Sequence, residues 1–146
     1  MKVVDANVLL YAVNPSARHH EASRRWLDGA LSGSETVGFS WLVLTAFVRL
    51  STKVGLFPHP LQPGQAMAVV RAWLGAPGAR MLEPGGAHLT LMESILSEVG
   101  SGGNLVSDAH LAAIALEANA GIVSYDTDFS RFERVRCSRP DDLLGR

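Results

Sequence analysis

The stretch Lys2-Val3-Val4-Asp5 decides the fold, because it joins a short apolar run to a carboxylate. Adjacent valines with no polar residue between them are typical of a strand that is buried on both faces of a parallel sheet. A second stretch of this kind, Ile122-Val123-Ser124-Tyr125-Asp126, lies near the other end of the chain. The sequence therefore predicts two buried parallel strands, each followed by an acid.

Between these two stretches, short apolar segments alternate with longer amphipathic ones. Strands are predicted at 2–5, 36–39, 80–82, 121–125 and 133–137. Helical spacing of apolar residues is predicted over 16–33, 40–50, 65–74, 88–99 and 108–119. This alternation predicts an α/β protein with a mostly parallel central sheet of about five strands.

Composition sets further bounds on the class of protein. The 146 residues fit one domain, and a hydrophobic content of 47% excludes a disordered chain. Thirteen basic and fourteen acidic residues give a net charge of −1, so binding to nucleic acid requires a local patch of charge. The one cysteine, Cys137, excludes an intrachain disulfide and favours a reducing compartment.

The first residues predict neither a secretion signal nor a membrane anchor. Asp5 stands where the apolar part of a signal peptide would begin. The longest early apolar run, residues 8–13, is far shorter than the roughly 20 residues that cross a bilayer. We therefore expect a cytoplasmic protein without a membrane partner.

Four aspartates fall where the predicted strands end or a helix begins. Asp5 and Asp126 follow strands, Asp128 comes two residues later, and Asp108 begins a predicted helix. In parallel sheets, ligands bind beyond the carboxyl ends of the strands. We therefore expect these four side chains to come together from three distant segments of the chain.

Carboxylates that lie close together need a counter-charge. Two like charges 4 Å apart repel by about 4 kcal/mol at an effective dielectric constant near 20. Oxygen ligands without a histidine and cysteine set favour Mg²⁺ or Mn²⁺ over zinc. Such an ion activates water and polarises a phosphoryl oxygen, which are the requirements of phosphodiester hydrolysis. The four aspartates therefore predict a metal-dependent nuclease.

Each of these residues also has a purely structural interpretation. Asp108 could cap a helix, and Asp126 with Asp128 could form an Asx turn. Asn7 could orient Asp5 through a hydrogen bond or only begin a turn. His110, two residues after Asp108, is interpreted as a packed or hydrogen-bonded helix residue and not as a general base.

Three segments resemble the signature blocks of PIN-domain proteins, and more narrowly those of VapC-type ribonuclease toxins: residues 3–11, 104–113 and 124–129. The resemblance covers essentially the whole chain, residues 1–146, as a single PIN domain. It implies a three-layer α/β/α sandwich and a Mg²⁺- or Mn²⁺-dependent endoribonuclease. It also implies a cognate VapB-type antitoxin and, usually, a homodimer.

The same resemblance assigns roles to individual residues. It implies Asp5 and Asp108 as the main metal ligands, Asp126 as a further catalytic acid and ligand, and Asp128 as an accessory ligand. The family commonly has a glutamate on the helix after the second strand, where this chain has Ala46. This departure leaves open whether one or two ions are bound.

Three residues are candidates for binding the RNA substrate: Asn7, Arg49 and Arg131. Arg131 follows the last two aspartates in a basic stretch, and RNA affinity is dominated by phosphate contacts. The structural alternative for both arginines is a solvated surface position or a surface ion pair.

Two other functions compete with the nuclease. An aspartyl phosphatase of the haloacid-dehalogenase type also has an aspartate after its first strand, but it requires Asp-x-Asp, and Asn7 stands in place of the second acid. A degenerate, non-catalytic domain that only binds RNA or an antitoxin is supported by Ala46.

Overall fold

The computed structural model describes residues 1–145 and contains a five-stranded parallel sheet. The strands follow the order β3-β2-β1-β4-β5 across the sheet, and every neighbouring pair is parallel. Their bounds are β1 (Lys2–Val4), β2 (Val37–Phe39), β3 (Ala79–Met81), β4 (Gly121–Val123) and β5 (Cys137–Ser138). The predicted α/β class and the parallel sheet are therefore confirmed.

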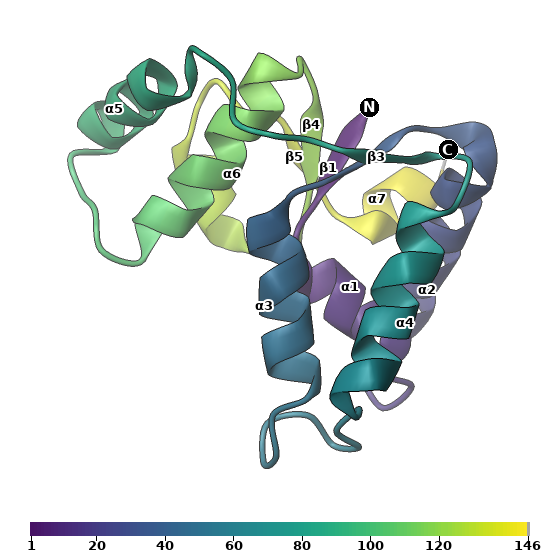
Figure 1. Cartoon of the computed structure of the whole chain (residues 1–146). Coiled ribbons are helices and arrows are strands. Elements are labelled where there is room, and N and C mark those ends of the chain that lie inside the picture. Colours follow the sequence, from purple (N-terminus) through teal and green to yellow (C-terminus); the bar gives the residue numbers. More distant parts are fainter. Residues whose placement is uncertain (146) are drawn as a thin grey trace.

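Helices cover the sheet on both sides, as Figure 1 shows: α5 and α6 lie on one side, and α2, α4 and α7 on the other. This arrangement confirms the three-layer α/β/α sandwich. The helices are α1 (Ala6–Val13), α2 (His20–Gly29), α3 (Trp41–Ser51), α4 (Pro63–Leu74), α5 (His88–Val99), α6 (Leu105–Glu117) and α7 (Pro140–Leu144). A π-helical turn, Ala30–Ser34, follows α2, and a 3₁₀ helix, η2 (Thr127–Arg131), follows β4.

None of the helices within residues 1–145 has the length and apolar character needed to span a bilayer.

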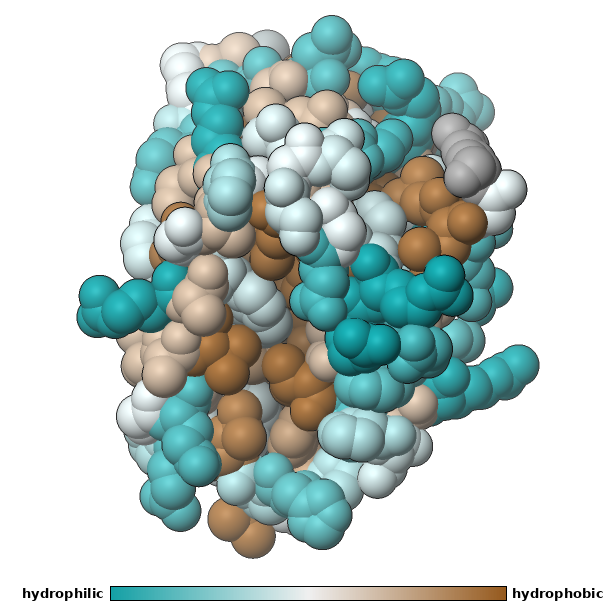
Figure 2. Space-filling view, turned by 90° about the vertical axis from the view of Figure 1, so that its right-hand side faces the viewer, coloured by the Kyte–Doolittle hydropathy of each residue, from teal (hydrophilic) through white to brown (hydrophobic). Residues whose placement is uncertain are grey.

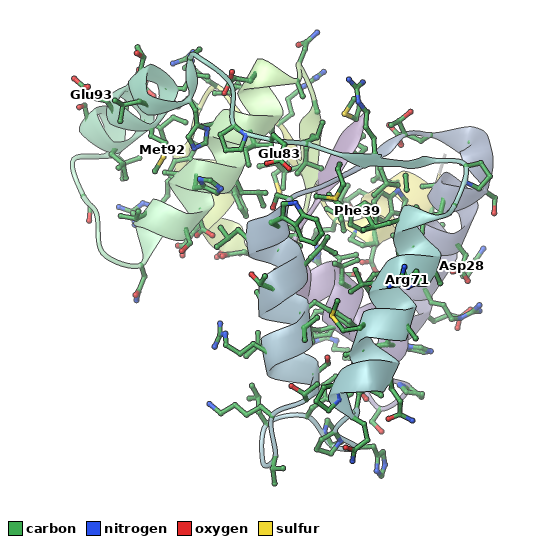
Figure 3. All side chains as sticks on the ribbon, viewed as in Figure 1. Asp28, Phe39, Arg71, Glu83, Met92 and Glu93 are labelled. Atoms are coloured by element: carbon green, nitrogen blue, oxygen red, sulfur yellow. The ribbon has the colours of Figure 1, made fainter. Side chains whose placement is uncertain are left out.

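The core forms where the apolar strands meet the helices. Val3 and Val4 of β1 are fully buried, as the uninterrupted apolar run predicts. On the β2 side, the Trp73 ring lies 6.3 Å from Phe39 and 4.8 Å from Phe47, measured between ring centroids. Figure 3 shows Phe39 at the inner end of the space between α3 and α4. Each such aromatic side chain contributes about 1.5–3 kcal/mol when fully buried, so this cluster fixes α3 and α4 against the sheet.

Local sequence signals explain where several helices begin and end. The Ser40 hydroxyl accepts a hydrogen bond from the Val43 amide at 3.2 Å and so caps α3. Helix α4 begins two residues earlier than expected, at Pro63, which suits the first turn because it has no amide hydrogen to satisfy. Helix α5 ends at Gly100, whose φ of 70° is a left-handed conformation that glycine adopts without strain.

Other bounds differ from the sequence prediction. Helices α1 and α7 were not predicted, and α2 begins at residue 20 instead of 16. Helix α6 begins at residue 105, so Asn104, and not Asp108, occupies the cap position. The last strand lies at 137–138 instead of 133–137, because the Val135 amide bonds back to the Phe132 carbonyl in a turn.

Candidate active site

Asp5 lies at the end of β1, where its carboxylate caps α1. Its Oδ1 accepts a hydrogen bond from the Ala6 amide at 2.8 Å. Its Oδ2 accepts from the Ser124 hydroxyl at 2.7 Å and from the Asn7 side-chain amide at 3.2 Å. Burial raises the pKa of Asp5, and these hydrogen bonds oppose the rise because they stabilise the charged form. The carboxylate is therefore held in one orientation at the edge of the sheet.

Asn7 and Ser124 join the ends of β1 and β4. The Asn7 side-chain amide also donates to the Ser124 hydroxyl at 3.0 Å, and its carbonyl oxygen accepts from the Tyr125 amide at 3.1 Å. Ser124, which is 1% exposed, accepts in turn from the Asp126 amide at 2.9 Å. Of the two interpretations of Asn7, the structure therefore favours orientation of Asp5. Ser124 was not singled out from the sequence, although it stands between a buried strand and an acid.

Asp108, Asp126 and Asp128 come together from two separate segments. Each offers one carboxylate oxygen, and these oxygens lie within 4.8 Å of one another. Asp108 lies in the first turn of α6, while Asp126 caps η2 by accepting from the Asp128 amide at 2.9 Å. The Asx-turn interpretation of Asp126 is thus confirmed, and the same residue also belongs to the cluster. Asp5 lies outside this triplet.

Asp5 nevertheless lies at the same site, because it lines one cavity with Asp108 and its charge acts on that residue. Partial burial is the largest cause that raises the pKa of Asp108 to about 7, and repulsion from Asp126, Asp5 and Asp128 adds to it. Repulsion from Asp126 also contributes to the raised pKa of Asp5. Four carboxylates from three segments therefore interact at the carboxyl ends of β1 and β4, where the sequence placed them.

A cavity of about 190 Å³ separates Asp5 and Asp108 from α3. Ala46 lines it, so the position where the family commonly has a glutamate faces this site. Arg49, one turn further along α3, lines the same cavity. Arg131 is exposed in η2 and is not part of the wall of this cavity.

The donor set fits a hard divalent cation. The triplet supplies three carboxylate oxygens, with Asp5 beside them, and neither histidine nor cysteine belongs to the triplet. Such oxygen ligands suit Mg²⁺ or Mn²⁺ better than zinc. Burial is the largest cause of the raised pKa values of Asp5 and Asp108, and repulsion between the carboxylates adds to it; a bound cation would offset that repulsion.

Comparison with known proteins identifies the class of this fold and site. The family model of the PIN domain matches residues 2–135, and the chain belongs to the PIN-domain family. This membership argues against the aspartyl phosphatase considered above.

Within that family, full-length relatives are named as VapC ribonucleases. The chain is 58% identical over 144 residues to Ribonuclease VapC37 of Mycobacterium tuberculosis, which covers 99% of this chain and 100% of the relative. It is 40% identical to Ribonuclease VapC43 of the same organism, over 97% of each chain. These similarities confirm the predicted resemblance to VapC-type proteins.

Solved structures confirm the fold at lower identity. A crystal structure of VapBC2 from Rickettsia felis, bound to a DNA fragment from its promoter, matches with a TM-score of 0.70 and 17% identity. It covers 94% of this chain and 97% of the other. VapC20 of M. tuberculosis, described as a toxin that cleaves the sarcin-ricin loop, matches with a TM-score of 0.66 and 19% identity, over 93% and 99% of the two chains.

Proposed function

We propose that this chain is a Mg²⁺- or Mn²⁺-dependent endoribonuclease that acts in the cytoplasm as the toxin of a toxin–antitoxin module. The observation that carries the proposal is the convergence of Asp108, Asp126 and Asp128, with Asp5 beside them, at the carboxyl ends of parallel strands. The names of the full-length relatives, which are VapC ribonucleases, support the choice of RNA as substrate.

The residues of the site have different proposed roles in phosphodiester hydrolysis. A bound divalent cation supplies a Lewis acid that polarises the phosphoryl oxygen and lowers the pKa of water. Asp5 and Asp108 would be the main ligands of that cation, with Asp126 as a further ligand and Asp128 as an accessory one. Ser124 and Asn7 orient Asp5 through their hydrogen bonds. We expect Arg49, which lines the cavity, to bind a phosphate of the RNA.

A VapB-type antitoxin and a second copy of the chain are the proposed protein partners. Support comes from matched structures that are toxin–antitoxin assemblies, including VapBC-1 of Haemophilus influenzae, with a TM-score of 0.67. Exposed apolar side chains provide surface for such contacts: Trp41 and Met67 are each 50% exposed and line one cavity between α3 and α4. Figure 2 shows apolar patches among polar side chains on one face of the molecule.

A second function, a non-catalytic domain that binds RNA or antitoxin, is favoured by one observation. Ala46 faces the cavity of Asp5 and Asp108, so α3 contributes no carboxylate at that position. The triplet on the other side of the cavity still offers three oxygens, which is enough for one Mg²⁺ that keeps several waters. The catalytic function is therefore the better supported of the two.

The test uses Asp5→Asn and Asp108→Asn in the full-length chain. A pool of bacterial RNA is incubated with each variant and with Mg²⁺, Mn²⁺ or EDTA. We expect the unmodified chain to cleave only with metal, and both variants to lose at least about 100-fold in rate. The matched control is Asp28→Asn, because Asp28 lies on the outer side of α2 (Figure 3) and pairs there with Arg24. Full cleavage by both site variants would overturn the proposed nuclease function. If the unmodified chain bound RNA without cleaving it, the non-catalytic binding function would be supported instead.

A further inference from the structure

A second cavity, of about 300 Å³, lies on the β5 side of the carboxylates. Residues of η2, β5 and the turn after β4 line it, and Asp126 belongs to its wall. Because Asp126 is also a member of the carboxylate triplet, this cavity adjoins the triplet directly. The cavity of Ala46 and Arg49 lies on the opposite side, towards α3. A polynucleotide with one phosphate at the carboxylates would therefore have one cavity on each side of that phosphate.

The lining of the second cavity combines apolar and polar groups. Phe129 and Val135, which are 1% and 9% exposed, form the packed apolar base of the cavity. Thr127 and Ser138 add hydroxyl groups, and Arg139 adds a guanidinium. Sites for small molecules typically have this mixture of apolar walls and a few polar groups, and a nucleoside matches it with a flat apolar face and a polar edge.

Arg139 is held in a position that suits a planar ligand. Its guanidinium lies over the Tyr125 ring, 4.9 Å from the ring centroid. Tyr125 is itself fixed, since its ring stacks on His19 at 4.1 Å and its hydroxyl donates to Asp141 at 2.6 Å. A guanidinium ordered by an aromatic ring offers a flat cationic surface, on which an RNA base can stack, and donors for its edge.

The charges around the cavity decide which part of an RNA it would accept. Asp126 lines the same cavity as Arg139, so the cavity is a poor site for a free anion. The phosphate would instead lie towards the triplet, where a cation offsets the acids. The space beyond, next to Arg139, is left for the sugar and base.

We propose that this cavity binds the nucleoside that adjoins the cleaved phosphodiester, with Arg139 as a residue that contacts its base. The proposal rests on the proposed ribonuclease function and adds to it a site where the identity of a nucleotide is read. Such a site selects RNA by one unstacked base, which is the usual way in which proteins recognise single-stranded RNA.

The test measures nucleoside binding separately from catalysis. The full-length chain, labelled with ¹⁵N and kept in EDTA, is titrated with adenosine, cytidine, guanosine and uridine, and amide resonances are followed by NMR. These probes carry no phosphate, so neither metal nor cleavage is needed. We expect at least one nucleoside to shift the amides of Thr127, Phe129 and Ser138 saturably.

Two variants and one control sharpen the result. Arg139→Ala is expected to weaken nucleoside binding about five-fold or more, and to raise KM for RNA while kcat changes little. Ser130→Trp, at an exposed position on the cavity wall, is expected to fill the cavity and abolish the shifts. Arg80→Ala removes the same charge from β3, at the opposite edge of the sheet, and should leave binding unchanged.

The outcomes separate this proposal from the ribonuclease function. Metal-dependent cleavage without saturable shifts at this cavity, or with equal losses in Arg139→Ala and Arg80→Ala, would overturn the nucleoside site alone. Shifts at the cavity in a chain that cleaves no RNA would overturn the ribonuclease and retain a nucleoside-binding site. Shifts that survive Ser130→Trp would place the nucleoside elsewhere and also contradict the proposal.

Discussion

Helix α6 carries two polar clusters that differ in how their charges are balanced. In the first, Asp108 meets other carboxylates, and burial together with their repulsion raises its pKa to about 7. In the second, His110 lies against His88 of α5, with a distance of 2.9 Å between His110 Nδ1 and His88 Nε2. The other nitrogen of His88, Nδ1, lies 3.7 Å from the Glu117 carboxylate. The two clusters thus start from one helix and face different neighbours.

The second cluster is held by the hydrogen bond between His88 Nε2 and His110 Nδ1, one of which carries the shared proton. His88 Nδ1 is buried and, within the part of the chain that the structure describes, has no hydrogen-bond partner, since Glu117 lies 3.7 Å away. The partial burial of His110 lowers its pKa, and so does the nearby His88. Glu117 also accepts from the Gly85 amide at 3.0 Å, so the cluster fastens the start of α5 to α6. The interpretation of His110 as a hydrogen-bonded helix residue is confirmed.

The difference teaches where function is to be sought. A cluster that pairs donors with acceptors stabilises packing through its internal hydrogen bonds. A cluster of like charges costs stability in the chain alone and is explained by what binds to it. The acids are therefore expected to govern activity, and the histidines to govern stability.

The largest expected effect is on activity, from Asp126→Asn. An amide retains the oxygen that accepts from the Asp128 amide, so the turn at η2 is kept. One negative charge leaves the cluster, and we expect RNA cleavage to fall at least about 100-fold. The melting temperature of the metal-free protein should stay the same or rise, because repulsion on Asp108 is removed. Cleavage assays and thermal melts in EDTA measure both quantities. If Asp126→Asn kept its activity but melted at a lower temperature, the acid cluster would govern stability and not activity, which contradicts the comparison.

A smaller effect, this time on stability, is expected from His88→Ala. The change removes the hydrogen bond to His110 and leaves a partly buried imidazole without that partner. We expect the free energy of unfolding to fall by about 1–3 kcal/mol, measured by urea denaturation, while cleavage per folded molecule is kept. His59→Ala is the matched control, because His59 is exposed in the loop between α3 and α4. Equal stability of the two variants would show that the cluster does not fasten α5.

The sequence predicts the acid cluster better than it predicts the local bounds of helices. A parallel sheet brings the carboxyl ends of its strands together, so Asp5 and Asp126 could be placed near each other from two apolar runs alone. Helix α1 was missed because its apolar residues, 8–13, form one continuous run without a polar face. Helix α7 was missed because it has only five residues, too few for a helical period to show.

The contacts that complete the site depend on geometry that spacing does not encode. Ser124 reaches Asp5 across 119 residues of sequence, and a serine at the end of a strand has many other uses. The pairing of His88 with His110 depends in the same way on how α5 packs against α6. Asp5 stays a predicted main ligand: it lines one cavity with Asp108, and the hydrogen bond at the α1 cap fixes its carboxylate beside the triplet.

The smallest expected effect is a change of stability with pH in the metal-free protein. The pKa of Asp108 is about 7 in the folded chain, against an ordinary value of 3.8. Between these values the folded state keeps a proton that the unfolded state has lost, so the free energy of unfolding falls as pH rises from about 4 to about 7. The effect is modest because the Asp108 side chain is only partly buried.

The measurement is a series of urea denaturations in EDTA across this pH range, for the unmodified chain and for Asp108→Asn. Both proteins retain His110, whose lowered pKa gives the opposite trend, so the difference between the two curves isolates Asp108. As pH rises, the free energy of unfolding of Asp108→Asn should increase relative to that of the unmodified chain, and this difference should level off above about pH 7. Adding Mn²⁺ should stabilise the unmodified chain most at high pH, because the cation binds the ionised carboxylates. Parallel curves at all pH values would mean that neither burial nor repulsion from the other carboxylates raises the pKa of Asp108, and the contrast with the histidine cluster would then lose its electrostatic basis.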